Sequence, residues 1–352
     1  MENDTMKIPF GEILYLNREE VIASGGLDMA SAISQIETML ALFDRHECID
    51  PPKSVLRWSD DPNIENTRGR INFLSGYVGG DINALGMKWI GSFPSNKINL
   101  ELPRATAIVV LNDADTGIPI AFMEGSVISA TRTAAITGVA VKHLAPKNTK
   151  IIGMIGAGVL SKAHLLMLHE ILDDIETIQL YNPTRRNGEK LKGEIEKLTG
   201  INVRLVDSAR AAFDGSDIAL TATTTHDPIV QKDWMKPGML TIQFAGHEFS
   251  FDAVSCADKI ICDDWNGLKH RAIMTPAKMY EAGKLSDADI YADLGAIVTG
   301  RKKGRENDSE IIHFASVGMG LSDVALAAMI YQNALDLDIG TRLPLWNNPD
   351  KN

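Results

Sequence analysis

The hydrophobic pattern of the chain changes character near residue 125. Before this point, short apolar runs are separated by turn residues such as Gly79-Gly80-Asp81, which is typical of strands joined by tight turns. One helix is expected from Asp28, a suitable N-cap, to about Glu47, because its apolar residues recur at steps of three and four. The strand-like runs lie at residues 54–58, 71–78, 84–90, 105–111 and 118–123. The pattern therefore predicts a helix and a mostly antiparallel sheet.

Beyond residue 126, strand and helix patterns alternate. After a helix at 126–144, strands are expected at residues 150–155, 177–181, 202–206, 218–222, 239–244 and 259–262, with helices near 159–172, 185–198 and 208–213. Such alternation is typical of a doubly wound parallel sheet and predicts an α/β fold. A long apolar helix at 318–335 follows, and it can pack back on the first domain.

Residues 150–161 carry a dinucleotide-binding motif. A buried strand precedes the glycine turn of Gly156, Ala157 and Gly158, and a helix begins at Val159 and Leu160. This arrangement presents a helix N-terminus to the pyrophosphate of a coenzyme. Ser161 stands in the place of the third glycine and is small enough to allow close packing of helix on strand. A plain strand-to-helix turn is the alternative interpretation.

The residues after the second parallel strand bear on the choice of coenzyme. NAD-binding chains usually carry a carboxylate there for the ribose hydroxyls. This chain has Asn182, Thr184 and Arg185 instead, which can bind a 2′-phosphate and favour NADP. Alternatively, Arg185 and Arg186 are only surface residues in the first turn of the next helix.

Two cations interrupt apolar segments of the first domain. Arg132 lies on the apolar helix and Lys88 on a strand. A buried guanidinium needs a carboxylate, a phosphate or carbonyl groups as partners, so Arg132 is a candidate for binding a substrate carboxylate or the pyrophosphate. The structural alternatives are an internal carboxylate for Arg132 and an edge strand for Lys88. Lys53 and Arg57, after Pro51-Pro52, are further candidates.

Composition narrows the classes of partner. The chain has 352 residues and a formal net charge of −11, which argues against nucleic acid and anionic membranes but allows a small anionic substrate. Its three cysteines lack metal-ligand spacing, so no metal is expected. We find no signal-peptide pattern and no apolar run long enough to span a bilayer, and therefore expect a cytoplasmic protein.

These motifs, taken in order, resemble the ornithine cyclodeaminase/mu-crystallin family over nearly the whole chain. They are Pro51-Pro52-Lys53, the strand lysine Lys88, residues 130–135, the glycine turn, residues 234–238 and residues 316–323. The resemblance implies a homodimer built through the N-terminal domain. We expect residues 1–125 and 316–352 to form an α+β dimerisation and substrate domain, and residues 126–315 to form a Rossmann domain.

The resemblance also implies roles for particular residues. Lys53, Lys88 and Arg132 would bind the substrate carboxylate, with Arg57 able to assist because Lys53 replaces the family's usual arginine. Arg132 would also approach the coenzyme, together with Thr133. By the same analogy Thr223 and Ser316 would line the coenzyme, and Val317 would border the substrate. Asp323 either orients the C-terminal helix or takes part in the site.

One departure from the family changes the expected chemistry. Ornithine cyclodeaminases carry a catalytic aspartate at the position of His247, so the histidine argues against ring closure of a diamine. The residues at 339–346 look most like the branch that oxidises N-(2-amino-2-carboxyethyl)-glutamate to an imine, which water splits into 2-oxoglutarate and 2,3-diaminopropionate. That branch is expected to use NAD, which conflicts with the interpretation of residues 182–186.

The sequence thus predicts hydride transfer at the C–N bond of a small amino or imino acid, with NAD or NADP. Lys88 or His247 would carry the proton, and clustered cations should lower the pKa of the lysine. A redox-neutral lyase, a ketimine or imino-acid reductase and a non-catalytic binding protein stay open as alternatives.

Overall fold

The computed structural model describes residues 11–58, 68–96, 100–225, 227–271 and 273–346. The chain divides into two compact units, one formed by residues 1–132 and 319–352 and the other by residues 133–318. We call these unit 1 and unit 2; the sequence analysis placed the boundaries after residues 125 and 315. The predicted fold class, α/β with a parallel Rossmann-type sheet, is confirmed.

Unit 1 is built on one sheet with the strand order β16-β1-β7-β6-β5-β4-β2, and β3 pairs with β4 beside β2. The strands are β1 (Glu12–Leu16), β2 (Cys48–Ile49), β3 (Ser54–Trp58), β4 (Gly69–Val78), β5 (Ala84–Ser92), β6 (Ala105–Asn112), β7 (Pro119–Glu124) and β16 (Thr341–Pro344). The antiparallel run from β3 to β7 agrees with the prediction. The structure adds β1, which is parallel to β7, and β16 at the edge.

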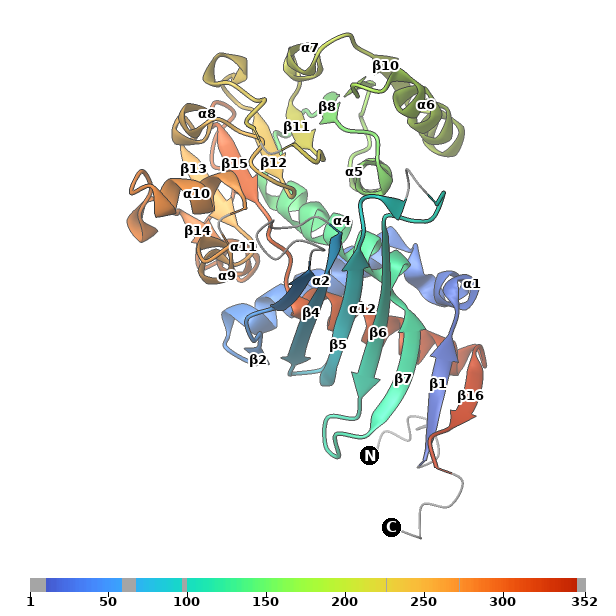
Figure 1. Ribbon diagram of the computed structural model, residues 1–352. Helices are drawn as coiled ribbons and strands as arrows, with labels where there is room; N and C mark the ends of the chain where they lie inside the picture. The colour runs from blue at the N-terminus through green and yellow to red at the C-terminus, as the bar shows by residue number, and fades with distance from the viewer. Residues whose placement is uncertain (1–10, 59–67, 97–99, 226, 272, 347–352) are drawn as a thin grey trace. The chain divides into compact units, whose positions relative to one another are not determined.

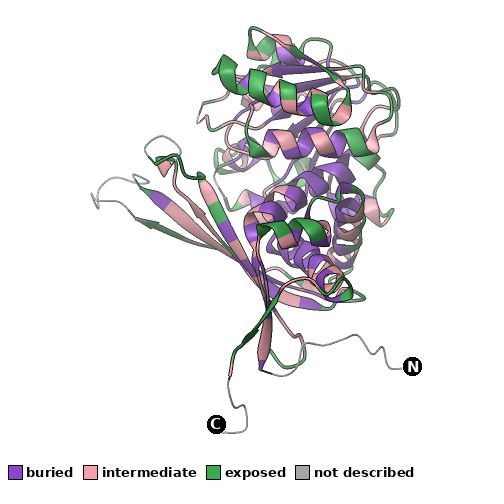
Figure 2. Cartoon of the chain, turned by 90° about the vertical axis from the view of Figure 1, so that its right-hand side faces the viewer, coloured by how far each residue is buried: buried purple, intermediate pink, exposed green. Residues whose placement is uncertain are grey.

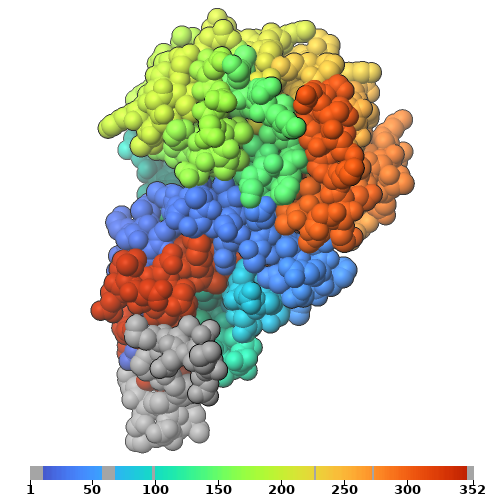
Figure 3. Space-filling view, turned by 180° about the vertical axis from the view of Figure 1, so that it is seen from behind, coloured from blue at the N-terminus to red at the C-terminus, as the bar shows by residue number. Residues whose placement is uncertain are grey.

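The helices of unit 1 are α1 (Arg18–Val21), a π-helical turn at Ile22–Gly26, α2 (Met29–Asp44) and α12 (Gly320–Asp336). Asp28 caps α2 by accepting from the backbone N–H of Ser31, as its sequence predicts. The α2 helix lies beside α12, where the Gln35 amide donates to the Ala325 carbonyl over 3.1 Å (Figure 3). The long helix α4 (Gly125–Leu144) begins in unit 1 and ends in unit 2.

The sheet of unit 1 has two different faces. Its helices lie on one side of the strands, and no helix of the described part of unit 1 lies on the other (Figure 2). Lys88 of β5 and its cross-strand partner Leu74 of β4 point to the helix side, where both are buried. The neighbouring pair Phe73 and Trp89 points to the uncovered side, where Trp89 is 42% exposed. This alternation decides which side chains can share a site with Lys88.

Unit 2 contains an all-parallel sheet with the order β10-β9-β8-β11-β12-β15-β13-β14, and helices lie on both sides of it (Figure 1). The strands are β8 (Ile151–Ile155), β9 (Thr177–Tyr181), β10 (Asn202–Leu205), β11 (Ile218–Thr221), β12 (Leu240–Gln243), β13 (Lys259–Cys262), β14 (Ala292–Asp293) and β15 (Ile312–Ala315). The hydrophobic pattern did not reveal β15, although it pairs with both β12 and β13 in the interior of the sheet.

The helices of unit 2 follow the predicted alternation and extend it. They are α5 (Val159–Ile171), α6 (Arg185–Thr199), α7 (Ala209–Phe213), α8 (Phe251–Ser255), α9 (Trp265–Lys269), α10 (Thr275–Glu281) and α11 (Leu294–Val298), with short 3₁₀ turns at Lys232–Trp234 and Asp287–Asp289. None of the helices in the described parts of the chain combines the length and the apolar character needed to cross a bilayer.

Candidate active site

The glycine turn follows β8 as the sequence predicts, and its first glycine is required by the backbone. Gly156 has a φ of 113°, and its N–H donates to the Tyr181 carbonyl over 2.9 Å. A Cβ atom at this position would lie 2.4 Å from the carbonyl oxygen of Ala222. Any other residue would strain the turn and displace the end of β11.

The second glycine leaves open space at the start of α5. Gly158 is the N-cap, and a Cβ placed on it would meet no atom of the described chain within 4 Å. The backbone N–H of Gly158 faces the Ser161 hydroxyl at 3.3 Å, and Ser161 is fully buried. Val159 in the first turn is 75% exposed, whereas Ala157 and Leu160 are half-buried. An open helix N-terminus beside a close backbone approach fits the pyrophosphate of a dinucleotide.

The predicted coenzyme-selecting residues lie between β9 and α6. The Asn182 amide donates to the Thr184 carbonyl over 2.9 Å, and Thr184 is the N-cap of α6. The Arg185 side chain is 66% exposed and lies between two carboxylates, Glu189 at 3.3 Å and Asp207 at 3.5 Å. Two carboxylates beside this arginine reduce the positive charge available for a 2′-phosphate.

Thr223, the predicted coenzyme residue after β11, is held by a buried carboxylate that the sequence analysis did not identify. Both the N–H and the hydroxyl of Thr223 donate to Oε1 of Glu248 over 2.7 Å, and the Thr221 hydroxyl donates to Oε2. Glu248 is fully buried, and burial raises the pKa of its carboxyl group. The sequence does carry one signal for Glu248, which is its position shortly after the strand predicted at residues 239–244. Ligands bind beyond the carboxyl ends of parallel strands, so a polar residue there is a candidate.

A second buried carboxylate fixes Ser316 and Val317. Asp263, at the end of β13, accepts from the Ser316 hydroxyl (2.8 Å) and from the N–H groups of Val317 (2.9 Å) and Gly318 (2.8 Å). Arg271 donates to the carbonyls of Val317 and Gly318 over 3.2 and 3.3 Å. Asp263 therefore accepts from the N–H and O–H groups of segment 316–318, and Arg271 donates to its carbonyl groups. The sequence analysis identified neither Asp263 nor Arg271.

His247 follows β12 and contacts the start of α10. Its Nδ1 lies 3.1 Å from the hydroxyl of Thr275, which also donates to the Phe249 carbonyl. Burial, and then the positive charge of Lys278, lower the pKa of His247, while Asp227 raises it. The imidazole is thus more strongly biased toward its neutral form than a histidine in water.

In unit 1, Lys88 and Arg132 converge on one carboxylate. Lys88 Nζ donates to Oδ1 of Asp323 over 2.8 Å and to the Ser129 hydroxyl over 3.0 Å, and Arg132 Nε donates to the same Oδ1 over 2.9 Å. Lys88, Arg132 and Asp323 are 1%, 8% and 0% exposed. Since β5 lies between β4 and β6, the edge-strand alternative for Lys88 is wrong.

The cluster holds two cations for one anion, and its polar atoms are incompletely paired. Burial first, and then Arg132, lower the pKa of Lys88 to about 8, although Asp323 opposes the shift. This is the predicted direction, with burial contributing more than the neighbouring cation. Within the described residues, Arg132 Nη1 and Asp323 Oδ2 are buried without hydrogen-bond partners. Excess positive charge and an unused guanidinium N–H suit the carboxylate of a ligand.

The other predicted site residues are placed differently. Lys53 is half-buried before β3, and Arg57 is exposed on β3, which β4 separates from the strand of Lys88. Thr133 is half-buried on α4, directly after Arg132. The tertiary structure therefore brings Lys88 and Arg132 together and places Lys53 and Arg57 two strands away from β5.

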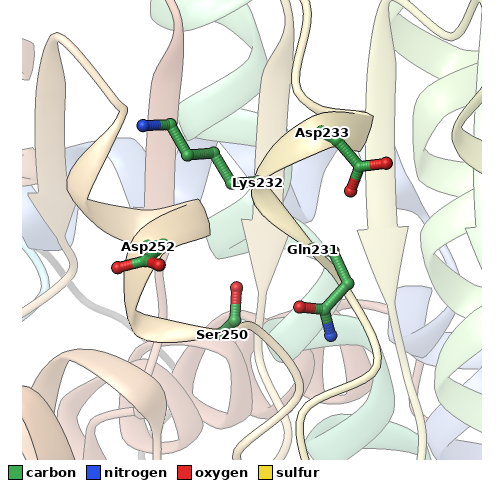
Figure 4. Close-up of a pocket in the computed structure, with 5 residues that line it drawn as sticks. All are labelled: Gln231, Lys232, Asp233, Ser250 and Asp252. Atoms are coloured by element: carbon green, nitrogen blue, oxygen red, sulfur yellow. The ribbon is translucent and has the colours of Figure 1, made fainter.

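A surface hollow of unit 2 involves none of these residues. It is lined by Gln231, Lys232, Asp233, Ser250 and Asp252, which come from the 3₁₀ turn after β11 and the start of α8 (Figure 4). Both acidic and basic side chains line it, and no predicted site residue does.

Comparison with known proteins decides the family. The model of the ornithine cyclodeaminase/mu-crystallin family matches residues 16–338. The chain belongs to this family. The match includes the glycine turn, the segment 316–318 and the cluster of Lys88, Arg132 and Asp323, so both candidate sites lie within the family's common region.

Several members of the family are similar to the chain over nearly their full length. N-((2S)-2-amino-2-carboxyethyl)-L-glutamate dehydrogenase of Staphylococcus aureus is 32% identical in sequence to this chain, over 95% of this chain and 99% of the dehydrogenase. The structure of Thermococcus litoralis Delta(1)-pyrroline-2-carboxylate reductase in complex with NADH and L-proline has a TM-score of 0.85 at 31% identity, covering 94% and 99%. An archaeal alanine dehydrogenase dimer with bound NAD has a TM-score of 0.86 at 28% identity, covering 95% and 100%.

Proposed function

We propose that this chain is an NAD-dependent oxidoreductase acting on the C–N bond of an amino-acid-derived secondary amine or imine. The observation that carries the proposal is the buried cluster of Lys88, Arg132 and Asp323. Its excess positive charge suits an α-carboxylate, as does Arg132 Nη1, which has no hydrogen-bond partner among the described residues. The glycine turn in the same chain fits a dinucleotide. Relatives of this chain are described as dehydrogenases of amino acids or their derivatives and as a reductase of a cyclic imino acid.

The residues of the chain would bind the substrate and move its proton. Arg132 would donate from Nη1 to the substrate carboxylate, which fixes the adjacent α-carbon. Lys88, with its lowered pKa, would accept the proton of the substrate nitrogen during oxidation and return it during reduction. Gly156, Gly158 and the first turn of α5 would hold the coenzyme, whose nicotinamide supplies the hydride chemistry when bound.

The specific substrate we propose is N-(2-amino-2-carboxyethyl)-glutamate. Its oxidation removes a hydride from the glutamate α-carbon and a proton from the nitrogen, leaving a C=N bond. Addition of water and cleavage of the C–N bond then give 2-oxoglutarate and 2,3-diaminopropionate. The similarity to the Staphylococcus aureus dehydrogenase supports this choice, as does His247 in place of the aspartate expected of cyclodeaminases.

We further propose NAD as the coenzyme and a homodimer as the assembly. Solved relatives carry NADH or NAD, and Arg185 already has two carboxylate neighbours. Leu56 pairs with Ile71 and Trp89 with Phe73, so both point to the uncovered face of the unit 1 sheet, where they are 52% and 42% exposed. An apolar sheet face of this kind is suited to a subunit interface, and one relative is described as a dimer.

Turnover and binding measurements together test this function. The wild-type chain should reduce NAD when given N-(2-amino-2-carboxyethyl)-glutamate and should release 2-oxoglutarate. Lys88→Met should abolish turnover while the dissociation constant for the coenzyme stays nearly unchanged. Release of ammonia without net coenzyme reduction would instead identify a lyase, and retained coenzyme without turnover on any amine or imine would identify a binding protein.

A further inference from the structure

The hydroxyl group of Thr275 lies among several polar groups of unit 2. Thr275 begins α10 and is fully buried. Gln243 Nε2 lies 3.0 Å from its oxygen, and the backbone N–H of Phe249 lies 3.3 Å from it. The Phe249 carbonyl oxygen and His247 Nδ1 each lie 3.1 Å from the same hydroxyl oxygen. A hydroxyl donates one hydrogen and has two lone pairs, which limits how these neighbours can be protonated.

Gln243 must present its NH₂ group to this hydroxyl. Its Nε2 also donates to the Gly246 carbonyl over 2.5 Å, and rotation of the amide would turn Oε1 toward that carbonyl instead. Two oxygens that can only accept hydrogen bonds repel each other at such a distance. The present orientation is therefore preferred, although Oε1 is buried and has no hydrogen-bond partner among the described residues. Gln243 and the Phe249 N–H thus use both lone pairs of the Thr275 oxygen.

The same hydroxyl decides which nitrogen of His247 carries the hydrogen. If Nδ1 were protonated, three donors would face an oxygen with two lone pairs, and one N–H would lack an acceptor. If Nδ1 is unprotonated, the single hydroxyl hydrogen is shared between Nδ1 and the Phe249 carbonyl. Buried N–H groups without an acceptor are rarer in proteins than under-satisfied carbonyls, and shared hydrogens are common. The neutral imidazole with its hydrogen on Nε2 is therefore favoured.

The Nε2 edge of the ring points away from Thr275, because the two ring nitrogens face in nearly opposite directions. The Phe251 ring lies against the imidazole at a centroid distance of 5.7 Å. His247 is half-buried and follows the carboxyl end of β12, and ligands bind at this edge of parallel sheets. The next residue, Glu248, holds Thr223, a predicted coenzyme residue. The Nε2–H group is thus a donor at the ligand-binding edge of unit 2.

We propose that Thr275 is a positioning residue for His247: it fixes the imidazole hydrogen on Nε2, and His247 presents this N–H to an acceptor group of the substrate. The second part rests on the proposed function, because the substrate must reach His247. A nitrogen that already carries its hydrogen does not take up a proton, so this role leaves Lys88 as the proton acceptor. The group that His247 recognises is an oxygen of a carboxylate or an amide, whereas an ammonium group only donates and finds no acceptor at Nε2.

Nitrogen NMR of the full chain with isotope-labelled histidine tests the tautomer. Correlation of the ring nitrogens with the ring C–H hydrogens distinguishes the two neutral tautomers, and His247→Gln identifies the His247 signals by their loss. We expect the wild-type chain at neutral pH to carry the hydrogen on Nε2. Thr275→Ser keeps the hydroxyl and should preserve the Nδ1 shift. Thr275→Val removes the donor to Nδ1 and should move that shift.

A matched control removes a hydroxyl that faces a different histidine. The Thr137 hydroxyl lies 3.1 Å from Nε2 of His164, and both residues are fully buried. Thr137→Val should therefore leave the His247 signals unchanged. A hydrogen on Nδ1 of His247 in the wild-type chain, or an unmoved Nδ1 shift in Thr275→Val, would overturn the role of Thr275.

A binding measurement tests the donor role toward the substrate. Calorimetric titration of N-(2-amino-2-carboxyethyl)-glutamate into the NADH-loaded full chain gives the dissociation constant without turnover, because NADH cannot accept a hydride. His247→Gln keeps an N–H donor and should weaken binding by less than about fivefold. His247→Asp offers only acceptors and should weaken it by about 10- to 100-fold. Equal losses in the two variants would overturn the donor role. If the wild-type chain shows the expected tautomer but does not bind this compound, the role of Thr275 stands and the proposed substrate is refuted.

Discussion

The pH dependence of amine oxidation provides a direct test of Lys88 as the proton acceptor. Burial and the neighbouring Arg132 lower the pKa of Lys88 to about 8, so the lysine side chain is mostly protonated below this pH and mostly neutral above it. Only the neutral form can accept a proton. The neutral fraction is 1/(1 + 10), about 9%, one pH unit below the pKa and about 91% one unit above it. We therefore expect kcat/KM for oxidation to rise about tenfold from pH 7 to pH 9 and then to level off.

Asp323→Asn moves the same inflection in a known direction. The Asp323 charge and its hydrogen bond to Lys88 both raise the pKa of the lysine, so their removal lowers it further. The inflection should shift to lower pH. Because the change also leaves two buried cations without their carboxylate, we expect a loss of about 3–5 kcal/mol in the free energy of unfolding, measured by denaturant titration.

A histidine control identifies the titrating group. The pKa of His247 lies below its usual value of 6.5, outside the window of Lys88, so His247→Gln should leave the inflection near pH 8 in place. The inflection can be measured for the wild-type chain, Asp323→Asn and His247→Gln from initial rates of amine oxidation at several pH values with saturating coenzyme. A flat wild-type profile, or an inflection that disappears in His247→Gln, would refute the assignment to Lys88.

The coenzyme-binding unit yields three further predictions. Gly156→Ala should reduce stability by about 1–3 kcal/mol and abolish coenzyme binding, whereas Gly158→Ala should preserve stability and weaken only coenzyme binding, as thermal unfolding with and without NADH will show. Asp263→Asn, which weakens the hold on segment 316–318, should lower kcat while the coenzyme dissociation constant changes less than tenfold, and an unchanged kcat would contradict this positioning role. Fluorescence titration should show tighter binding of NADH than of NADPH, and Arg185→Ala should not reverse the order; a clear NADPH preference would reject NAD as the coenzyme.

Much of the fold could be predicted because its signals are local. The antiparallel strands β3 to β7 and the alternating elements from β8 to α7 depend on short apolar runs, turn residues and helix caps within each segment. β15 could not be placed in this way. Its four buried residues follow a long polar segment, and its position between β12 and β13 depends on pairing with strands far away in sequence.

The candidate site shows the same division. Lys88 and Arg132 could be predicted as site candidates because each is a cation within an apolar segment, which is visible in the sequence alone. Asp323 could be read as either a helix-orienting or a functional residue until the structure placed it 2.8 Å from Lys88. Glu248 and Asp263 were missed, although each follows a strand-like run, because nothing local tells which backbone groups a buried carboxylate will bind.

By itself the sequence determined the two-part organisation, the glycine turn and the presence of cations in apolar surroundings, because each of these depends on residues that are close together in the sequence. Only the tertiary structure decided that Lys88 and Arg132 share one carboxylate, that of Asp323. The physical reason is that pairing of buried charges depends on strand register and helix packing, which join residues up to 235 positions apart. Charge pairing at that range is settled by desolvation and geometry rather than by any local pattern.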